Sequence, residues 1–263
     1  MLSIIHFPHK NNTHFSKRKD NLNFKKRWIY ACFLFIMQLR TTMEIKPIAH
    51  IQTPFKEKFG VPRQSGRVAV KGRIVFEKEY RNPDALRGVE EFSHFWLLFD
   101  FSLAHRAEFC PTVRPPRLGG NQKVGVFASR SPFRPNNIGL SLVKLLSVEH
   151  DERDGDCLIV EGADLIDGTP IYDIKPYVPT DCVKDAVCSY ADKHFYDKLQ
   201  VVWACDEEIN SEEKRTIIEC IQEDPRPSYQ DDDREYGMIF SGYNVRFKVE
   251  NGVATVFAIE SSK

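Results

Sequence analysis

The sequence predicts a mainly β protein, in which a β-barrel is followed by a small α+β domain. Two patterns carry this prediction. Between Ile45 and Asp173, short apolar runs of strand length alternate with turns roughly every 8–15 residues, and helical periodicity is almost absent. Beyond Pro179 the pattern changes to a strand, an amphipathic helix and a hairpin. The 263 residues and the 42% hydrophobic content suit a protein of one large or two modest domains that buries a core.

The first part of the chain contains the expected barrel strands, separated by turn sequences such as the one at 151–156. The run at 92–103 is nearly continuous in apolar and aromatic residues, which is typical of a strand buried on both faces, although a buried helix fits the pattern too. His94 in this run is interpreted as a core histidine. The expected strands are Ile45–Ile51, Ile74–Phe76, Phe92–Leu103, Lys123–Ala128, Ile138–Val148, Cys157–Gly162 and Ile171–Asp173.

The second part begins with an expected strand over Lys198–Cys205. A helix is expected from Ser211, which stands at the cap position before two glutamates, and it should end before Pro225. The turn signal Asn251-Gly252 predicts a hairpin within 237–259. These elements divide the chain into a barrel at 43–180, a linker at 181–197 and a C-terminal domain at 198–263.

Residues 1–42 are set apart by their charge. They carry eight Lys or Arg and one Asp, and their apolar run, Trp28–Met37, is too short for a membrane span of about 20 residues. The segment is either a targeting sequence or an upstream translation that precedes a functional start at Met43, and the second interpretation is preferred. It is expected to be disordered or non-native, and it is excluded from the fold.

Charge and cysteine content limit the class of protein. The net charge is zero overall, so residues 43–263 are acidic, and any nucleic-acid binding must come from local basic patches. The seven cysteines show no pairing or metal-ligand spacing, and the histidines show no metal motif. These features favour a cytoplasmic protein without a disulfide framework or a metal site. No glycine-rich dinucleotide or phosphate-loop motif is present.

The stretch from Pro111 to Ser141 is the first candidate site. Its prolines and its Gly119-Gly120 pair predict a bent, defined rim, and cations on a rigid rim indicate an anionic ligand. A loop with solvated arginines is the alternative. The cations are Arg114, Arg117, Lys123, Arg130 and Arg134.

The second candidate site is the turn that contains Asp164, Asp167 and Asp173. Closely spaced carboxylates after a strand can bind a metal, accept hydrogen bonds from a ribose, or pair with the arginines of the rim. The alternative is ordinary Asp-Gly turn chemistry, which is equally favoured for Asp167. Arg63-Gln64 and Arg130-Ser131 also fall at strand ends, where the mouth of a barrel gathers ligand groups.

Seven blocks in order resemble the TsaA/YaeB family, whose characterised members are the TrmO tRNA (adenine-N6)-methyltransferases. The resemblance covers Met43 to the C-terminus. Asn137 departs from it, since relatives usually carry Pro there, and this is expected to loosen the turn. The blocks are FKEKFGVPRQ, RGVEEFSHFWLLF, PTVRPPRLGGN, VGVFASRSPFRPNNIGLS, DLIDGTPIYDIKPY, EDPRPSY and YNVRFKV.

The resemblance implies a β-barrel methyltransferase without a Rossmann fold, which binds S-adenosyl-L-methionine. The implied substrate is threonylcarbamoyladenosine at position 37 of a tRNA anticodon loop, methylated on N6 by a homodimer without metal. The cofactor contacts that it implies are Gln64, Ser65, Gly66, Ser102, Leu103, Arg130, Leu140, Glu161, Gly162, Ala163 and Asp164.

The catalytic base is left open between Asp164, Asp167 and a backbone carbonyl. Arg114, Arg117 and Arg134 are expected to hold phosphates of the anticodon loop or the threonyl carboxylate, and 224–229 either contacts the tRNA or braces the C-terminal domain. Two alternative functions remain: a methyltransferase of the same fold that acts on another nucleoside or a small molecule, and a non-catalytic RNA- or nucleotide-binding barrel.

Overall fold

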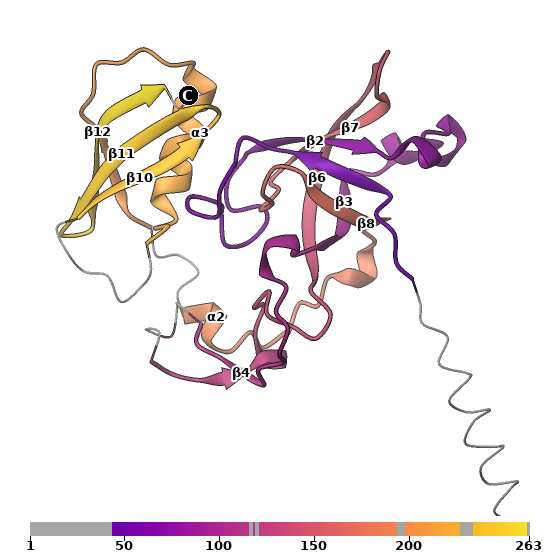
Figure 1. Ribbon diagram of the computed structural model, residues 1–263, viewed down its shortest axis with the longest axis horizontal. Helices are drawn as coiled ribbons and strands as arrows, with labels where there is room; N and C mark the ends of the chain where they lie inside the picture. The colour runs from indigo at the N-terminus through magenta and orange to yellow at the C-terminus, as the bar shows by residue number, and fades with distance from the viewer. Residues whose placement is uncertain (1–43, 116–117, 119–120, 194–197, 227–233, 262–263) are drawn as a thin grey trace, which may run out of the picture. The chain divides into compact units, whose positions relative to one another are not determined.

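The computed structural model describes residues 44–115, 118, 121–193, 198–226 and 234–261 (Figure 1). The chain divides into a unit of residues 1–45 and a unit of residues 46–263, and the fold below is that of the second unit. The predicted N-terminal extension at 1–42 lies outside the described residues.

Six antiparallel strands form a closed barrel in the order β1-β2-β7-β6-β3-β8. The last strand in this order pairs back onto the first, through Ala49 with Ile171 and Ile51 with Thr169. The prediction of a mainly β protein is therefore confirmed. The strands are β1 (Ala49–Gln52), β2 (Lys71–Phe76), β3 (His94–Asp100), β6 (Ile138–Asp151), β7 (Gly155–Glu161) and β8 (Thr169–Pro176).

Side chains alternate between the interior and the exterior of the barrel, as the period of two in a strand requires. On β3, Phe95, Leu97 and Phe99 are buried in the core, while the residues between them are only half-buried. The prediction of a strand buried on both faces was therefore wrong for the outer face. His94 lies on this outer face with its Nδ1 2.9 Å from the Ser93 hydroxyl, so the prediction of a core histidine was wrong as well.

The connections contain short elements. The predicted strand Lys123–Ala128 is reduced to a two-residue strand followed by a turn of 3₁₀ helix, because only Val124 and Gly125 find a partner strand. The elements are η1 (Lys78–Tyr80), η2 (Pro83–Leu86), η3 (Val89–Glu91), η4 (Ser102–Ala104), β4 (Thr112–Val113), β5 (Val124–Gly125), η6 (Val126–Ala128), η7 (Pro179–Asp181) and α2 (Tyr190–Lys193).

The C-terminal part is a four-stranded sheet with one long helix. The strand order is β10-β11-β12-β9, and β9 runs parallel to β12. The predicted hairpin turn at Asn251-Gly252 is confirmed, since both residues have positive φ. The elements are β9 (Gln200–Trp203), α3 (Ser211–Gln222), β10 (Glu235–Phe240), β11 (Tyr243–Glu250) and β12 (Val253–Ser261).

Helix α3 ends at Gln222, before Pro225, as predicted. Its cap is Asn210 rather than the predicted Ser211: the Asn210 side chain accepts a hydrogen bond of 2.8 Å from the amide of Glu212. Ile217 and Ile221 are fully buried in the core of this part. The apolar face of the helix therefore covers the sheet, as the spacing of its isoleucines predicts.

One loop of the barrel enters this second core. Between β1 and β2, the side chains of Phe55, Val68 and Val70 are buried with those of α3 and the C-terminal sheet. The Phe55 ring meets the Phe240 ring edge-on, with centroids 5.6 Å apart. The loop at 53–70 is here called the shared loop. It connects two strands of the barrel, but its apolar side chains pack in the C-terminal core.

A buried ion pair fastens the same loop. Arg67 Nε lies 2.7 Å from Glu223 Oε2, and the two side chains are only 9% and 5% exposed. The neighbouring amide of Ala69 donates to Glu219 of α3 at 3.1 Å. Arg63 donates to the carbonyls of Asp224 and Arg226, so the start of the 224–229 segment braces the loop; 227–229 lie outside the described residues.

We expect Glu223→Ala to lower the free energy of unfolding by about 3 kcal/mol, because it removes a buried carboxylate that pairs with both Arg67 and Lys198. Urea unfolding followed by circular dichroism measures this. The matched control is Lys71→Ala, which breaks the ion pair of Lys71 with Glu212 of α3, where both side chains are about half exposed. Equal losses in the two variants would contradict the importance of the buried pair.

Candidate functional site

Strand topology gathers the predicted site residues at one end of the barrel. In an antiparallel barrel every second connection lies at the same end, and the registers place Gln52, Lys71, Asp100, Ile138, Glu161 and Thr169 at a common end. The connections at this end are 53–70, 101–137 and 162–168. The predicted cofactor contacts fall on these three connections or on the strand residues next to them.

Two of these connections touch through their backbones. The amide of Gly66 donates to the carbonyl of Gly162 at 2.8 Å, and the amide of Gly162 donates to the carbonyl of Val70 at 2.9 Å. Gly162 has a φ of +89°, and a Cβ there would lie 3.3 Å from the Gly66 backbone. The positive φ at 162 therefore favours glycine, and the close approach of Gly66 leaves little room for a side chain there.

Asp164 is the centre of a small polar network. The Ser141 hydroxyl donates to Asp164 Oδ1 at 2.6 Å, and the hydroxyl of Ser65 accepts from the amide of Leu142 at 3.1 Å. Burial raises the pKa of the Asp164 carboxyl. The hydrogen bond from Ser141, backbone hydrogen bonds and the charge of Arg130 lower this pKa and oppose the effect of burial.

Ser141 was missed by the sequence analysis. It is fully buried, and it follows the inward-facing Gly139 and precedes the inward-facing Val143 on β6. A hydroxyl at an inward position of an otherwise apolar barrel is a signal that the sequence contains. Alternation in the sequence alone suggests that the larger residues Ile138 and Leu140 face the core, which would place Ser141 outside. In the barrel these two side chains point outward, so Ser141 faces inward.

Arg130 joins the second connection to the first. Its Nη1 donates to Gln64 Oε1 at 2.7 Å, which links two side chains that were both predicted to contact the cofactor. Gln64 itself is only a few residues from Arg67, which the buried ion pair holds. Gln64 is thus held on one side by Arg130 and on the other by the nearby ion pair of Arg67 with Glu223.

Arg134 supports the rim from within. Its Nη1 donates to the carbonyls of Val126 and Ser129, at 3.1 and 2.8 Å. Of the other cations expected to hold phosphates, Arg114 is exposed at the end of β4, whereas Arg117 lies outside the described residues. Arg134 therefore shapes the loop, and Arg114 offers an exposed charge.

Asn137 tightens the turn that it was expected to loosen. Its Nδ2 donates to the carbonyl of Pro132 at 2.7 Å and to that of Ala104 at 3.4 Å. Its own carbonyl accepts from the amide of Phe101 at 2.8 Å. Proline has no side-chain donor and cannot make the first two bonds, so the expectation of a looser turn was wrong.

The remaining predicted contacts lie on the same connections or on the strand residues next to them. Leu103 on η4 is 61% exposed and Leu140 on β6 is 48% exposed, so both present apolar surface to solvent. The carbonyl of Leu103 accepts from Lys58 of the shared loop at 2.9 Å, next to Ser102. Glu161, at the end of β7, is partly buried and lies 3.8 Å from the Lys144 ammonium; Ala163 is fully buried.

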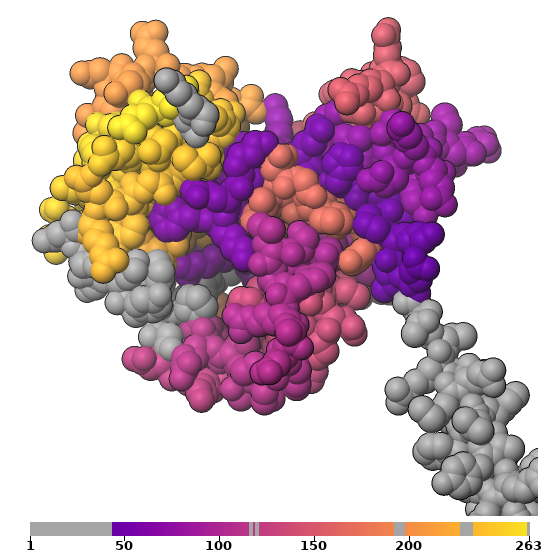
Figure 2. Space-filling model, in the orientation of Figure 1, coloured from indigo at the N-terminus to yellow at the C-terminus, as the bar shows by residue number. Residues whose placement is uncertain are grey.

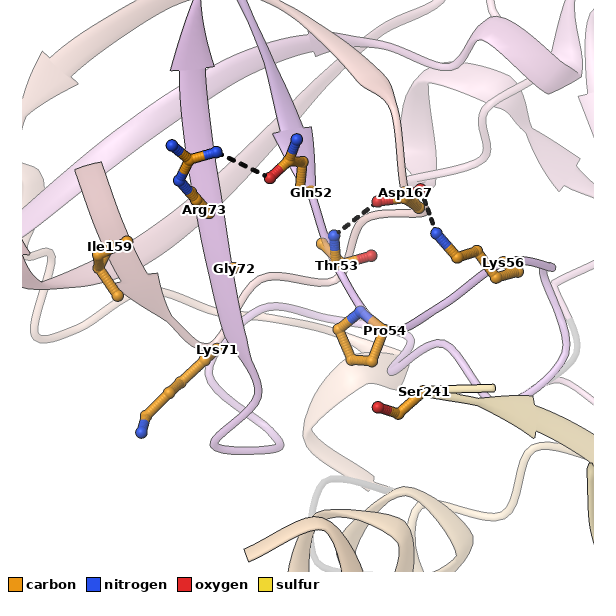
Figure 3. Close-up of a pocket in the computed structure, with 10 residues that line it drawn as sticks. All are labelled: Gln52, Thr53, Pro54, Lys56, Lys71, Gly72, Arg73, Ile159, Asp167 and Ser241. Atoms are coloured by element: carbon orange, nitrogen blue, oxygen red, sulfur yellow. Dashed lines mark hydrogen bonds and ion pairs between the residues drawn. The ribbon is translucent and has the colours of Figure 1, made fainter. Parts of the chain in front are cut away.

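Asp167 has different partners from Asp164. Its Oδ1 accepts from the amide of Thr53 at 2.9 Å, and its Oδ2 lies 2.5 Å from the Lys56 ammonium (Figure 3). It lines an open hollow of about 550 Å³. Two further cations there, Lys71 and Arg73, are paired with carboxylates. Asp167 thus fixes the start of the shared loop, which fits the turn interpretation of this residue.

The described residues offer neither a metal site nor a membrane-spanning helix. They contain no group of three or more His, Cys, Asp or Glu side chains placed to hold a metal ion. No helix in the described ranges is both long enough and apolar enough to cross a membrane.

We expect Asp164→Asn to stabilise the fold increasingly as pH rises. The pKa of the Asp164 carboxyl is higher in the folded than in the unfolded chain. Its contribution to the stability of the fold is therefore complete below the unfolded pKa, about 4. That contribution is lost as the pH rises through the folded pKa. Asn keeps the hydrogen bond to Ser141 without titrating. Urea unfolding of both proteins at pH 4, 6 and 8 tests this, and a difference that does not change with pH would contradict it.

Comparison with known proteins assigns the family. The tRNA-methyltransferase O N-terminal domain matches residues 50–182, and the TrmO C-terminal domain matches residues 195–262. The tRNA (adenine(37)-N6)-methyltransferase of Escherichia coli K12 is 41% identical over 233 residues, which are 84% of this chain and 99% of that protein. The enzyme of the same name from Eikenella corrodens is 46% identical over 175 residues, 64% of this chain and 97% of that protein.

A solved structure agrees with these sequence relatives. The crystal structure of TrmO from Pseudomonas aeruginosa superimposes with a TM-score of 0.67 at 32% identity, and the match covers 84% of this chain and 98% of that one. Both domain matches, the full-length relative and the shared fold lead to one conclusion: this chain belongs to the TrmO family of tRNA methyltransferases.

Proposed function

We propose that this chain transfers the methyl group of S-adenosyl-L-methionine to N6 of threonylcarbamoyladenosine at position 37 of a tRNA. Two bacterial relatives bear the name tRNA (adenine(37)-N6)-methyltransferase, and a relative from Pseudomonas aeruginosa bears that of a putative S-adenosylmethionine-dependent methyltransferase. The observation that carries the proposal is the convergence of Gln64, Arg130 and Asp164 from three connections at one end of the barrel.

The residues at this end fit the chemistry of the cofactor. Leu103 and Leu140 offer apolar surface for the adenine ring, while the carboxylates of Glu161 and Asp164 suit ribose hydroxyls or an ammonium group. S-adenosylmethionine supplies an electrophilic methyl group when it is bound. The residues proposed to hold it are Gln64, Ser65, Gly66, Ser102, Leu103, Arg130, Leu140, Glu161, Gly162, Ala163 and Asp164.

The protein's task in such a transfer is mainly to position the reacting atoms. The contacts of Gly66 with Gly162 and of Gln64 with Arg130 hold the three connections together before any ligand arrives. Little rearrangement is then needed on binding. A backbone that is already ordered avoids part of the entropy cost of forming the complex.

Asp164 is the better candidate for the proton acceptor. The carbonyl of the threonylcarbamoyl group makes the N6 proton more acidic than in plain adenosine, so a carboxylate is a sufficient base. A raised pKa makes Asp164 a stronger base than an ordinary carboxylate. Both oxygens of Asp167 are engaged by Thr53 and Lys56, so its role is structural.

The tRNA is proposed to lie along the cationic rim at 111–141. Arg114 is exposed and suits a phosphate or the threonyl carboxylate. We propose the same role for Arg117 and Arg134. Arg134 acts partly through the loop that its hydrogen bonds support.

We also propose a homodimer. Ile138, Leu140 and Leu103 are each more than a third exposed, and the first two lie on the outer face of the barrel beside the site. An apolar strand face next to the cofactor residues suits a second copy of the chain. The cytoplasm is proposed as its location, and the boundaries 43–180, 181–197 and 198–263 as its domain division.

The decisive assay measures methyl incorporation from labelled S-adenosylmethionine into tRNA with and without the threonylcarbamoyl group at adenosine 37. We expect label only in the modified tRNA, with protein that begins at Met43. Equal label in both tRNAs would contradict the proposed specificity. No label in either, despite cofactor binding, would favour a different acceptor.

Substitution separates the two carboxylates. We expect Asp164→Asn to lower kcat at least 100-fold, as for loss of a general base, whereas Asp167→Asn retains most of the activity. Steady-state kinetics with modified tRNA measures both variants. Full activity of Asp164→Asn would move the role to a backbone carbonyl, and inactivity of a folded Asp167→Asn would reverse the assignment.

A further inference from the structure

Phe127 is exposed in an unusual setting. Its side chain is 73% exposed, although the preceding residue, Val126, is buried at 1%. Both lie on η6, within the connection that also carries Arg130. An exposed phenyl ring does not gain the free energy that burial of its apolar surface would give. A ligand that stacks on the ring would supply this free energy.

The backbone under this ring is firmly held. The amide of Val126 donates to the carbonyl of Pro111 at 2.9 Å, and its carbonyl accepts from Ser129 Oγ at 2.8 Å. The hydroxyl of Tyr190 donates to the carbonyl of Ala128 at 3.2 Å. The ring is therefore presented from an ordered turn, so a partner that stacks on it loses little to loop ordering.

Cations accompany the ring. The Arg134 guanidinium lies over it, 5.6 Å from its centroid, and on the same connection the Arg106 guanidinium lies 3.4 Å above the Phe133 ring. Aromatic rings interleaved with arginine are typical of surfaces that bind single-stranded nucleic acid.

The charge of the connection contrasts with the rest of the protein. Residues 105–134 contain six Lys or Arg and one Glu, whereas the remainder of 43–263 contains 23 basic and 35 acidic residues. In Figure 2 the magenta atoms of this connection form one continuous part of the surface. A polyanion is the partner that this contrast favours.

The ring also lies close to the proposed reaction site. Phe127 and Arg130 are three positions apart in the chain, so their Cα atoms are at most about 11 Å apart, and Arg130 is hydrogen-bonded to Gln64. Neighbouring nucleotides of an RNA loop are within reach over such a distance.

We propose that Phe127 stacks on an unpaired base of the anticodon loop, adjacent to the adenosine that is methylated, and so sets the position of the loop. This rests on the proposed function for the identity of the RNA. Every nucleobase is planar, so any of the four can stack on the Phe127 ring. The neighbouring cations attract the phosphates on either side of that base.

The test compares Phe127→Ala, Phe127→Leu and Phe127→Trp with the wild type. We expect the Ala and Leu variants to raise KM for tRNA between about 5-fold and about 100-fold, the range for loss of one base stack, and the Trp variant to remain near wild type. KM for S-adenosylmethionine should not change. The matched control is Phe109→Ala, which removes another exposed ring, 56% exposed, from the same connection.

Binding measured without cofactor separates this proposal from the proposed function. An anticodon stem-loop with 2-aminopurine at position 38 should bind with quenched fluorescence, and Phe127→Ala should weaken binding and restore the fluorescence. If binding depends on Phe127 but the protein methylates no tRNA when S-adenosylmethionine is supplied, the proposed function is overturned and the stacking proposal stands.

Three outcomes would overturn the stacking proposal. The first is a Phe127→Leu variant that matches the wild type in tRNA binding, which would show that bulk and not a π-face matters. The second is a Phe127→Ala variant that changes only the oligomeric state in size-exclusion chromatography with light scattering, which would assign the ring to contact with a second copy. Wild-type protein that fails to bind the stem-loop at all would overturn both proposals.

Discussion

The burial of the shared loop in a second hydrophobic core is the constraint on which the site depends. Phe55, Val68 and Val70 leave the barrel and are buried among residues of α3 and the C-terminal sheet. The Arg67–Glu223 pair, almost excluded from solvent, adds a directional contact between them. A buried ion pair contributes little net stability, but its geometry is specific, since either charge left alone in the interior is costly. The loop between these anchors carries Gln64, Ser65 and Gly66.

The opposite side of the loop is held by the barrel. Gly66 meets Gly162 backbone to backbone, and Ser65 accepts from the amide of Leu142. Arg130 donates to Gln64, so short contacts fix the three connections at this end of the barrel to one another, although they are distant in sequence. The C-terminal part therefore contributes to the site without supplying a reacting group, because it sets the position of a loop that the barrel alone would hold on one side only.

Much of the fold was predictable because strand alternation and helix spacing are local properties of a sequence. The helix over 211–222 and the turn at Asn251-Gly252 were predicted from a few neighbouring residues and are confirmed. The errors concern properties that are not local. His94 was placed in the core because its neighbours are apolar, but only the closure of the barrel decides which side of β3 faces inward. Ser141 was missed for the same reason: on β6 the small residues face inward and the large ones outward.

The sequence by itself determined the family, most of the barrel strands, the long helix, and the types of side chain at the site, because these follow from residue identity and short-range periodicity. Only the tertiary structure decided which of those side chains meet. It separated Asp164, bonded to Ser141, from Asp167, bonded to Thr53 and Lys56, although both had been candidates for the catalytic base. It also gave Asn137 two carbonyl partners and left Phe127 exposed on a fixed turn. Such pairings depend on distances between segments far apart in sequence, which are set when strands close into a barrel and a loop is buried in a neighbouring core.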